Sequence, residues 1–164
     1  MASPRQSGLY GALYLHVSTA PALASVVKVA DTFNLAFETN VEMHNCTRKG
    51  EGFSRFMPGE GASRITGDAN FQALAVLLSI AEGPLATPVS GTPYVRIAFK
   101  LVTNDGDQAP ATVLAAADLP IAGQQIVQGF GWMARHVLNV PDDEAITTPF
   151  EIQVDGEWDL VTST

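Results

Sequence analysis

The sequence predicts one β-rich domain, spanning residues 1–164, with a single amphipathic helix and a long projecting arm. Fourteen glycines and ten prolines are spread along the chain, which suits short elements joined by turns better than a helical bundle. Alternating apolar and polar residues recur in several segments, as in half-buried strands. The 46% hydrophobic content is enough for the core of one domain.

The strands are expected wherever apolar residues alternate or run between turn residues. Residues 1–8 are expected to be a flexible start, and the apolar residues on both faces of Leu9–Val17 indicate a strand buried on two sides. Ala111–Leu119 fits either a strand or a short helix. The other expected strands are Ser25–Val29, Phe33–Met43, Ser63–Thr66, Tyr94–Leu101 (with Arg96 and Lys100 facing out), Ile126–Val140 (with a bulge at Gly129 or Gly131) and Ile146–Val154.

One amphipathic helix is expected after Asp68. Either Asp68 or Asn70 is a suitable N-cap, and Gly83 followed by Pro84 ends the helix. The apolar residues at three- and four-residue spacing are Phe71, Leu74, Leu77, Leu78 and Ala81. Turns are expected at Asn104–Asp107, Pro141–Glu144 and Asp155–Glu157, the last leading to Trp158 and a polar tail, residues 159–164.

The charge and the cysteine count restrict the function. Nine basic residues against seventeen acidic ones give a net charge of −8, which argues against ordinary nucleic-acid binding and would instead let DNA pass without sticking. Cys46 is the only cysteine, so no internal disulfide forms and a reducing compartment is the simpler expectation. The apolar segment Leu9–Val17 resembles the hydrophobic region of a signal peptide, but His16 and two tyrosines within it argue against one. No apolar run is long enough to span a membrane.

No residue pattern predicts an enzyme, a metal site or a cofactor. His44 and Cys46 would share one strand face, yet two ligands do not make a zinc site. Glycine pairs such as Gly50 and Gly52 match no phosphate-binding motif. The acids of Pro141–Glu144 are expected to form a solvated turn. The sequence therefore indicates assembly rather than catalysis.

The arm, Thr47–Pro58, is the candidate assembly site. It mixes basic and acidic side chains with two phenylalanines and a methionine, and a glycine-hinged hairpin cannot bury these apolar groups within itself. A docking limb for a neighbouring subunit, with opposite charges setting the register, explains this mixture better than a mobile loop. The candidate residues are Thr47, Arg48, Lys49, Glu51, Phe53, Arg55, Phe56 and Met57.

The order of these segments resembles the major tail tube protein family of long-tailed, siphovirus-type bacteriophages, which is also related to the tubes of gene transfer agents. The matching segments are GALYLHV, FNLAFETNVEM, CTRKGEGFSRFMPGEGASRITGDANF and the later strand pair around VPDDEAITTPFEI. The resemblance extends from about Gly8 to Trp158 and leaves Ala111–Gln125 unmatched. It rests on the order of the elements rather than on a single motif.

The resemblance implies a β-sandwich or barrel with one flanking helix. It further implies hexameric rings whose sheets join into an inner barrel, with the arm reaching an adjacent ring so that rings stack into a tube. Such a subunit would bind other tail proteins, namely the tape measure, terminator and baseplate or tip proteins. It would be assembled in the host cytoplasm, would lie in the virion tail, and would need no membrane. An anionic lumen would let DNA slide through during ejection.

Three alternatives stay open at this point. The first is a related ring protein, from a secretion tube or a tail completion complex. The second is a small-ligand or carbohydrate-binding β-domain that stacks its ligand on Trp132, Trp158 and Tyr94. The third, an enzyme centred on Cys46 or His136, has the least support from the sequence.

Overall fold

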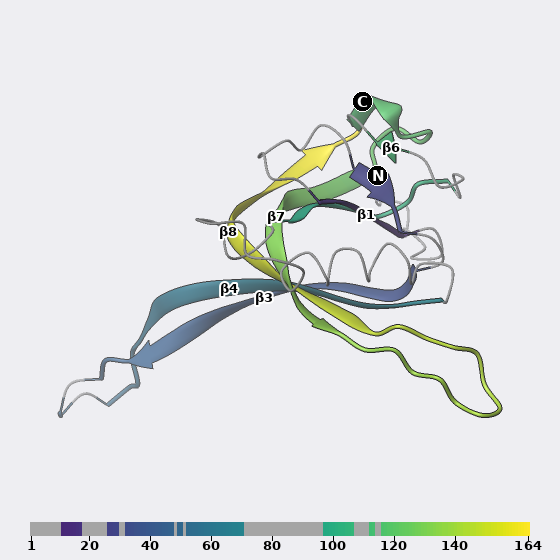
Figure 1. Ribbon diagram of the computed structural model, residues 1–164. Coiled ribbons are helices and arrows are strands. Elements are labelled where there is room, and N and C mark those ends of the chain that lie inside the picture. The colour runs from purple at the N-terminus through teal and green to yellow at the C-terminus, as the bar shows by residue number, and fades with distance from the viewer. Residues whose placement is uncertain are drawn as a thin grey trace, which may run out of the picture.

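The computed structural model describes residues 11–17, 26–29, 32–47, 49–50, 52–70, 97–106, 112–113 and 116–164. These residues form one eight-stranded antiparallel sheet, in the order β3-β4-β8-β7-β5-β1-β2-β6 (Figure 1). Its elements are β1 (Ala12–Val17), β2 (Val26–Lys28), β3 (Thr32–Asn45), β4 (Phe56–Ala69), β5 (Ile97–Val102), β6 (Thr112–Val113), the 3₁₀ helix η3 (Ala116–Asp118), β7 (Gln125–His136) and β8 (Phe150–Thr162). The fold is mainly β, as predicted.

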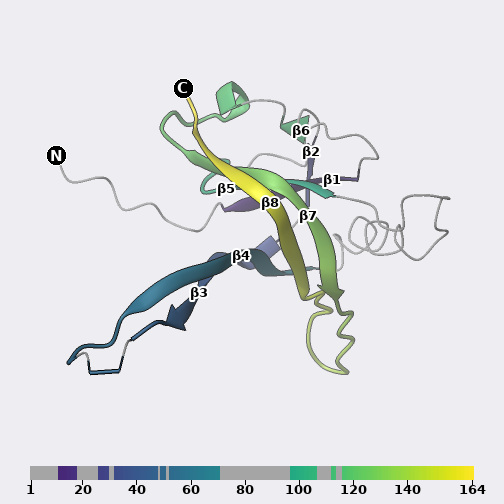
Figure 2. The ribbon, with the colours of Figure 1, turned by 90° about the vertical axis from the view of Figure 1, so that its left-hand side faces the viewer.

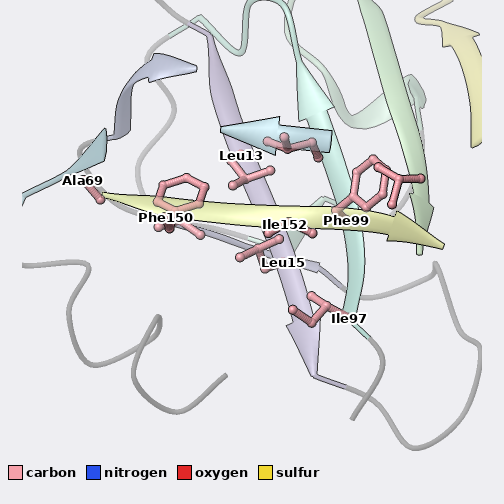
Figure 3. Close-up of a cluster of buried hydrophobic side chains, with 10 residues drawn as sticks. Leu13, Leu15, Ala69, Ile97, Phe99, Phe150 and Ile152 are labelled. Atoms are coloured by element: carbon pink, nitrogen blue, oxygen red, sulfur yellow. The ribbon is translucent and has the colours of Figure 1, made fainter. Parts of the chain in front are cut away.

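The inner face of the sheet curls around one apolar cluster (Figure 3). Leu13 and Leu15 of β1 share this cluster with Ile65 of β4 and with Phe150 and Ile152 of β8. Three strands separate β1 from β4 in the sheet, so only a curled sheet can bring their side chains together. The described residues thus form a single curled sheet, and the implied sandwich or closed barrel is not confirmed.

The outer face of β1 and β5 is buried as well. Ala12 and Tyr14 pack there with Leu119 and Ile126 in a second apolar cluster, which confirms that β1 is covered on both faces. The prediction that Lys100 faces solvent is wrong, because its residue is only 3% exposed on this covered face. Burial lowers the pKa of Lys100, and the negative charge of Asp118 partly opposes this shift.

The end of the chain differs most from its prediction. Gly129 pairs with Trp158 and Gly131 with Val154, so three residues of β8 stand opposite one residue of β7. Asp155–Glu157 is therefore a bulge within β8 rather than a turn, and Gly156 takes the positive φ of 81° there. The predicted polar tail, residues 159–164, is wrong too, because β8 continues to Thr162 along β7. The bulge predicted at Gly129 or Gly131 does lie between these glycines in the pairing, but its extra residues belong to β8 and β7 itself is not interrupted.

The remaining predictions have mixed outcomes. Strands appear in all the expected segments, but their bounds differ. The strand β4 is fourteen residues long and far exceeds the expected Ser63–Thr66. The strand expected at Ile126–Val140 ends at His136, and the one expected at Ile146–Val154 begins only at Phe150. The segment Ala111–Leu119 contains both a two-residue strand and the 3₁₀ helix. Residues 1–8, Tyr94–Arg96 and the predicted helix from Phe71 lie outside the described residues. Of its two proposed caps, Asp68 lies within β4 and Asn70 forms an isolated bridge with Thr147.

Candidate assembly surface

The arm is a two-stranded hairpin that projects from the body of the molecule (Figures 1 and 2). We define it as Thr39–Ser63, in which β3 and β4 pair from Thr39↔Ser63 to Asn45↔Phe56. The sequence placed its arm at Thr47–Pro58, but only residues 46–55, which we call the tip, lie beyond the last strand pair. Because the ladder hydrogen bonds run along the arm, it is a structured limb rather than a loop.

One face of the arm is apolar. Residues paired across an antiparallel ladder point to the same side, so Met43 shares a face with Pro58, and Phe56 shares that face with Asn45. Val41 lies two residues before Met43 on the same side. The exposed fractions of Val41, Met43 and Phe56 are 42%, 54% and 55%. This face continues the core side of the hairpin into solvent, where nothing in the described part of the chain covers it.

The opposite face of the arm is charged at its base. Arg64 donates from Nε to Glu38 Oε2 at 2.7 Å, and its Nη2 lies 2.6 Å from the same oxygen. Glu151 of β8 adds a longer contact of 3.8 Å to Nη1. The hydrogen bond from Arg64 to Glu38 is the main reason that the pKa of Arg64 is raised. These exposed pairs set the register at which the hairpin leaves the body, but they add little to stability.

Short polar contacts hold the tip. The backbone N–H of Thr47 donates to Asn45 Oδ1 (2.9 Å), and Thr47 Oγ1 accepts from the backbone N–H of Arg55 (2.8 Å). The backbone N–H of Cys46 donates to the carbonyl oxygen of Arg55 (2.9 Å). Gly50 takes a φ of 94°, a conformation that favours glycine. The tip is therefore closed by hydrogen bonds from its backbone to the side chains of Asn45 and Thr47 and to the Arg55 carbonyl.

The structure places six of the eight candidate arm residues. Phe53, at the tip, is the most exposed large apolar side chain among the described residues, at 88%, and Met57 is 59% exposed. Thr47 helps to close the turn, and Phe56 belongs to the apolar face. Lys49 and Arg55 are also exposed. Arg48 and Glu51 lie outside the described residues.

A second exposed segment was missed in the sequence. We call the β7–β8 connection, residues 137–149, the acidic loop, since it holds three acidic residues and no basic one. Asn139 and Thr147 exchange backbone hydrogen bonds of 2.9 and 3.2 Å, which anchor the loop. Leu138 and Val140 are 44% and 64% exposed. The turn at Pro141–Glu144 agrees with its prediction, but the exposed apolar pair beside it could have been noticed from the sequence alone.

The residues considered for other chemistry are dispersed. Cys46 Sγ lies 3.5 Å from the carbonyl oxygen of Arg55, and His136 lies on β7, where its buried Nε2 has no hydrogen-bond partner among the residues that the structure describes. Among the described residues, no three His, Cys, Asp or Glu side chains gather where they could hold a metal. No helix in that part of the chain is long and apolar enough to cross a membrane.

The two described aromatic residues of the ligand-binding alternative, Trp132 and Trp158, line neither of the hollows found in the described part of the chain. Trp158 packs edge-on against Phe37 with ring centroids 5.0 Å apart, and Trp132 lies on β7, while Tyr94 is outside the described residues. Two shallow hollows lie at the base of the arm and beside Pro149, and their linings contain neither tryptophan. The arm and the acidic loop remain the most prominent exposed features.

Comparisons with known proteins give matches of structure only. Neither a protein-family model nor a curated protein sequence matches this chain. A chain from the tail of an empty gene transfer agent particle with C6 symmetry has a TM-score of 0.62 at 12% identity, covering 95% of this chain and 98% of that chain. The SPP1 tail tube gives 0.60 at 11% identity, covering 96% and 78%. A chain of the anti-feeding prophage baseplate gives 0.56 at 9% identity, covering 98% and 97%.

These matches show a shared fold along almost the whole chain. A tail tube-like fold, which the sequence resemblance implied, is therefore confirmed. At identities of 9–12% the likeness reaches no further than the fold, so the siphovirus-type family is not confirmed.

Proposed function

We propose that this chain is a structural, non-catalytic subunit of a virion tail tube. Copies of it form hexameric rings, and the rings stack into a tube through which DNA passes during ejection. The observation that carries this proposal is the likeness to chains of tail assemblies, which covers 91–98% of the chain. The exposed hairpin arm adds support, because a monomer gains nothing from an apolar limb held in solvent.

The arm is the assembly element in this proposal. Its apolar face and the tip side chains become buried against a neighbouring subunit, in the same ring or the adjacent one. The net charge of −8 is compatible with a lumen that repels DNA. The tape measure, terminator and baseplate or tip proteins are the expected further partners, with assembly in the host cytoplasm and the finished subunit in the virion tail.

Electron microscopy of the purified protein tests the proposal. Negative staining across a concentration series should show rings or tubes with a central hole. A variant in which Asn-Gly replaces the tip, residues 46–55, keeps the strand pair Asn45↔Phe56 in a two-residue hairpin. It should fold, as followed by circular dichroism, and form no tubes. Tubes that persist without the tip would refute the role of the tip. If the intact protein forms neither rings nor tubes, with or without a tail extract as initiator, the proposed function is refuted.

A second candidate comes from one comparison. The baseplate chain of the anti-feeding prophage has the same fold over 98% of this chain, which supports a ring protein of a related injection or tail completion complex. The same images separate the two candidates, because such a protein would form single rings that do not stack.

A further inference from the structure

The tip and the acidic loop carry opposite charges in an acidic protein. Three of the nine basic residues of the chain lie in Thr47–Met57, together with one acidic residue. The acidic loop has three acids, and within the described part of the chain neither these acids nor Lys49 makes an ion pair. Each surface also exposes apolar side chains, Phe53 and Met57 on one and Leu138 and Val140 on the other. The two surfaces are therefore complementary in charge and alike in having uncovered apolar groups.

One molecule cannot join its own two surfaces. The arm and the acidic loop leave the body at the same end and diverge from each other in both views (Figures 1 and 2). The complementary contact thus needs a second copy placed beside the first. Such a contact joins two different surfaces, so when each copy uses its tip on one neighbour and its acidic loop on another, repeating it generates a closed ring or an open filament.

We propose that the tip of one copy docks on the acidic loop of the next copy in the same ring. Lys49 and Arg55 face the three loop acids, and the exposed apolar side chains of the two surfaces cover each other. This inference rests on the proposed function for the ring itself, and it names the surface that receives the arm. Since both surfaces lie at one end of the molecule, the contact is lateral and leaves the opposite end of the subunit for stacking.

A charge-swap experiment tests the pairing. The arm reversal is Lys49→Glu with Arg55→Glu, and the loop reversal is Asp142→Lys with Asp143→Lys. Each reversal should raise the critical concentration for self-association, measured by light scattering and sedimentation, by at least about tenfold, because like charges then face each other. The chain carrying both reversals should recover to within about threefold of the wild type, since attraction is restored with the signs exchanged.

Net charge alone predicts a different result. The loop reversal changes the net charge from −8 to about −4. If only net charge mattered, the weaker repulsion between copies would improve assembly. The docking contact predicts the opposite, that the same variant assembles less well than the wild type. Glu157→Lys with Asp159→Lys is the matched control, because it makes the same change in charge at two exposed positions of β8 away from the loop. It should assemble at least as well as the wild type. No recovery in the doubly reversed chain would overturn the proposal.

Cross-linking gives a second readout that does not depend on tubes. Cys46 at the tip is exposed and is the only cysteine, so Val140→Cys adds one partner thiol on the acidic loop. A short bismaleimide should then link chains into dimers and higher ladders. Ala122→Cys, exposed just before the start of β7 and so at the opposite end of this strand from the acidic loop, is the control and should not form such links.

The two experiments separate this inference from the proposed function. Tubes in the wild type without selective cross-links would refute the lateral contact and leave the tube subunit intact. Selective cross-links and charge-swap recovery without any tubes would support the contact and count against the tube.

Discussion

The buried carboxylate of Asp105 is expected to be the most sensitive polar position in the body of the protein. Its residue is 1% exposed, and its Oδ2 accepts a hydrogen bond from the Tyr14 hydroxyl (3.0 Å) and lies 2.7 Å from Lys28 Nζ. Burial, and then the negative charge of Asp105, raise the pKa of Tyr14 far above its usual range. One carboxylate thus ties β1 and β2 to the loop that follows β5.

Asp105→Ala removes the partner of two groups at once. Removing one member of a buried ion pair costs about 3–5 kcal/mol, because the other member loses the attraction that offsets its desolvation. For a chain of this size that loss corresponds to a fall in Tm of roughly 6–20 °C. Tyr14→Phe keeps the ring packing and loses only the hydrogen bond to a charged acceptor, at about 1.5 kcal/mol.

Urea denaturation followed by tryptophan fluorescence measures these changes in the free energy of unfolding. The chain with both substitutions is the decisive variant, because the Tyr14 hydroxyl has no acceptor left once Asp105 is absent. Tyr14→Phe should then cost almost nothing, which gives a coupling energy of about 1.5 kcal/mol. Additive losses, or a cost below about 1 kcal/mol for Asp105→Ala, would show that this reasoning is wrong.

Two further predictions concern the long strands. A Cβ at Gly131 would lie 2.5 Å from the Gln153 carbonyl oxygen, so Gly131→Ala should lower the free energy of unfolding by about 1–3 kcal/mol, measured by urea denaturation. Gly52 has open space around it, so the control Gly52→Ala should leave the stability unchanged. Equal stability of the two variants would contradict the close packing at Gly131. The second prediction concerns His136, whose pKa burial lowers below 6.5 in the folded protein. The unfolded chain therefore binds more protons than the folded one, and the free energy of unfolding falls as the pH drops from 7 through the folded pKa. His136→Gln should flatten this dependence between pH 7 and 5, and an unchanged slope would remove His136 as its cause.

Local patterns predicted the strands because strand alternation is a local property. Apolar residues on both faces of β1 indicated its double burial, and the two β7 glycines indicated where the register shifts, although the extra residues lie in β8. The same reasoning failed for Asp155–Glu157 and the residues after it. An Asp-Gly pair favours a tight turn in isolation, but pairing with β7 keeps these residues in a strand, where Gly156 absorbs the distortion.

The sequence predicted only part of the candidate assembly surface. The mixture of phenylalanine and basic residues indicated a docking limb, yet its length depended on β4, whose first half contains a proline and two glycines and carries no strand signal of its own. Those residues form a strand because β3 offers a ladder of hydrogen bonds. Lys100 illustrates the reverse error, since strand alternation correctly placed it opposite Phe99 but could not show that this second face is covered.

The sequence by itself determined the β-rich composition, the acidic charge and the order of the elements, because each depends on residue identity and on spacing along the chain. Only the tertiary structure decided which faces are covered, how far the hairpin extends and that the arm and the acidic loop diverge from one end. These features depend on pairing between residues far apart in the chain, such as Tyr14 with Asp105, and no local pattern encodes such pairing.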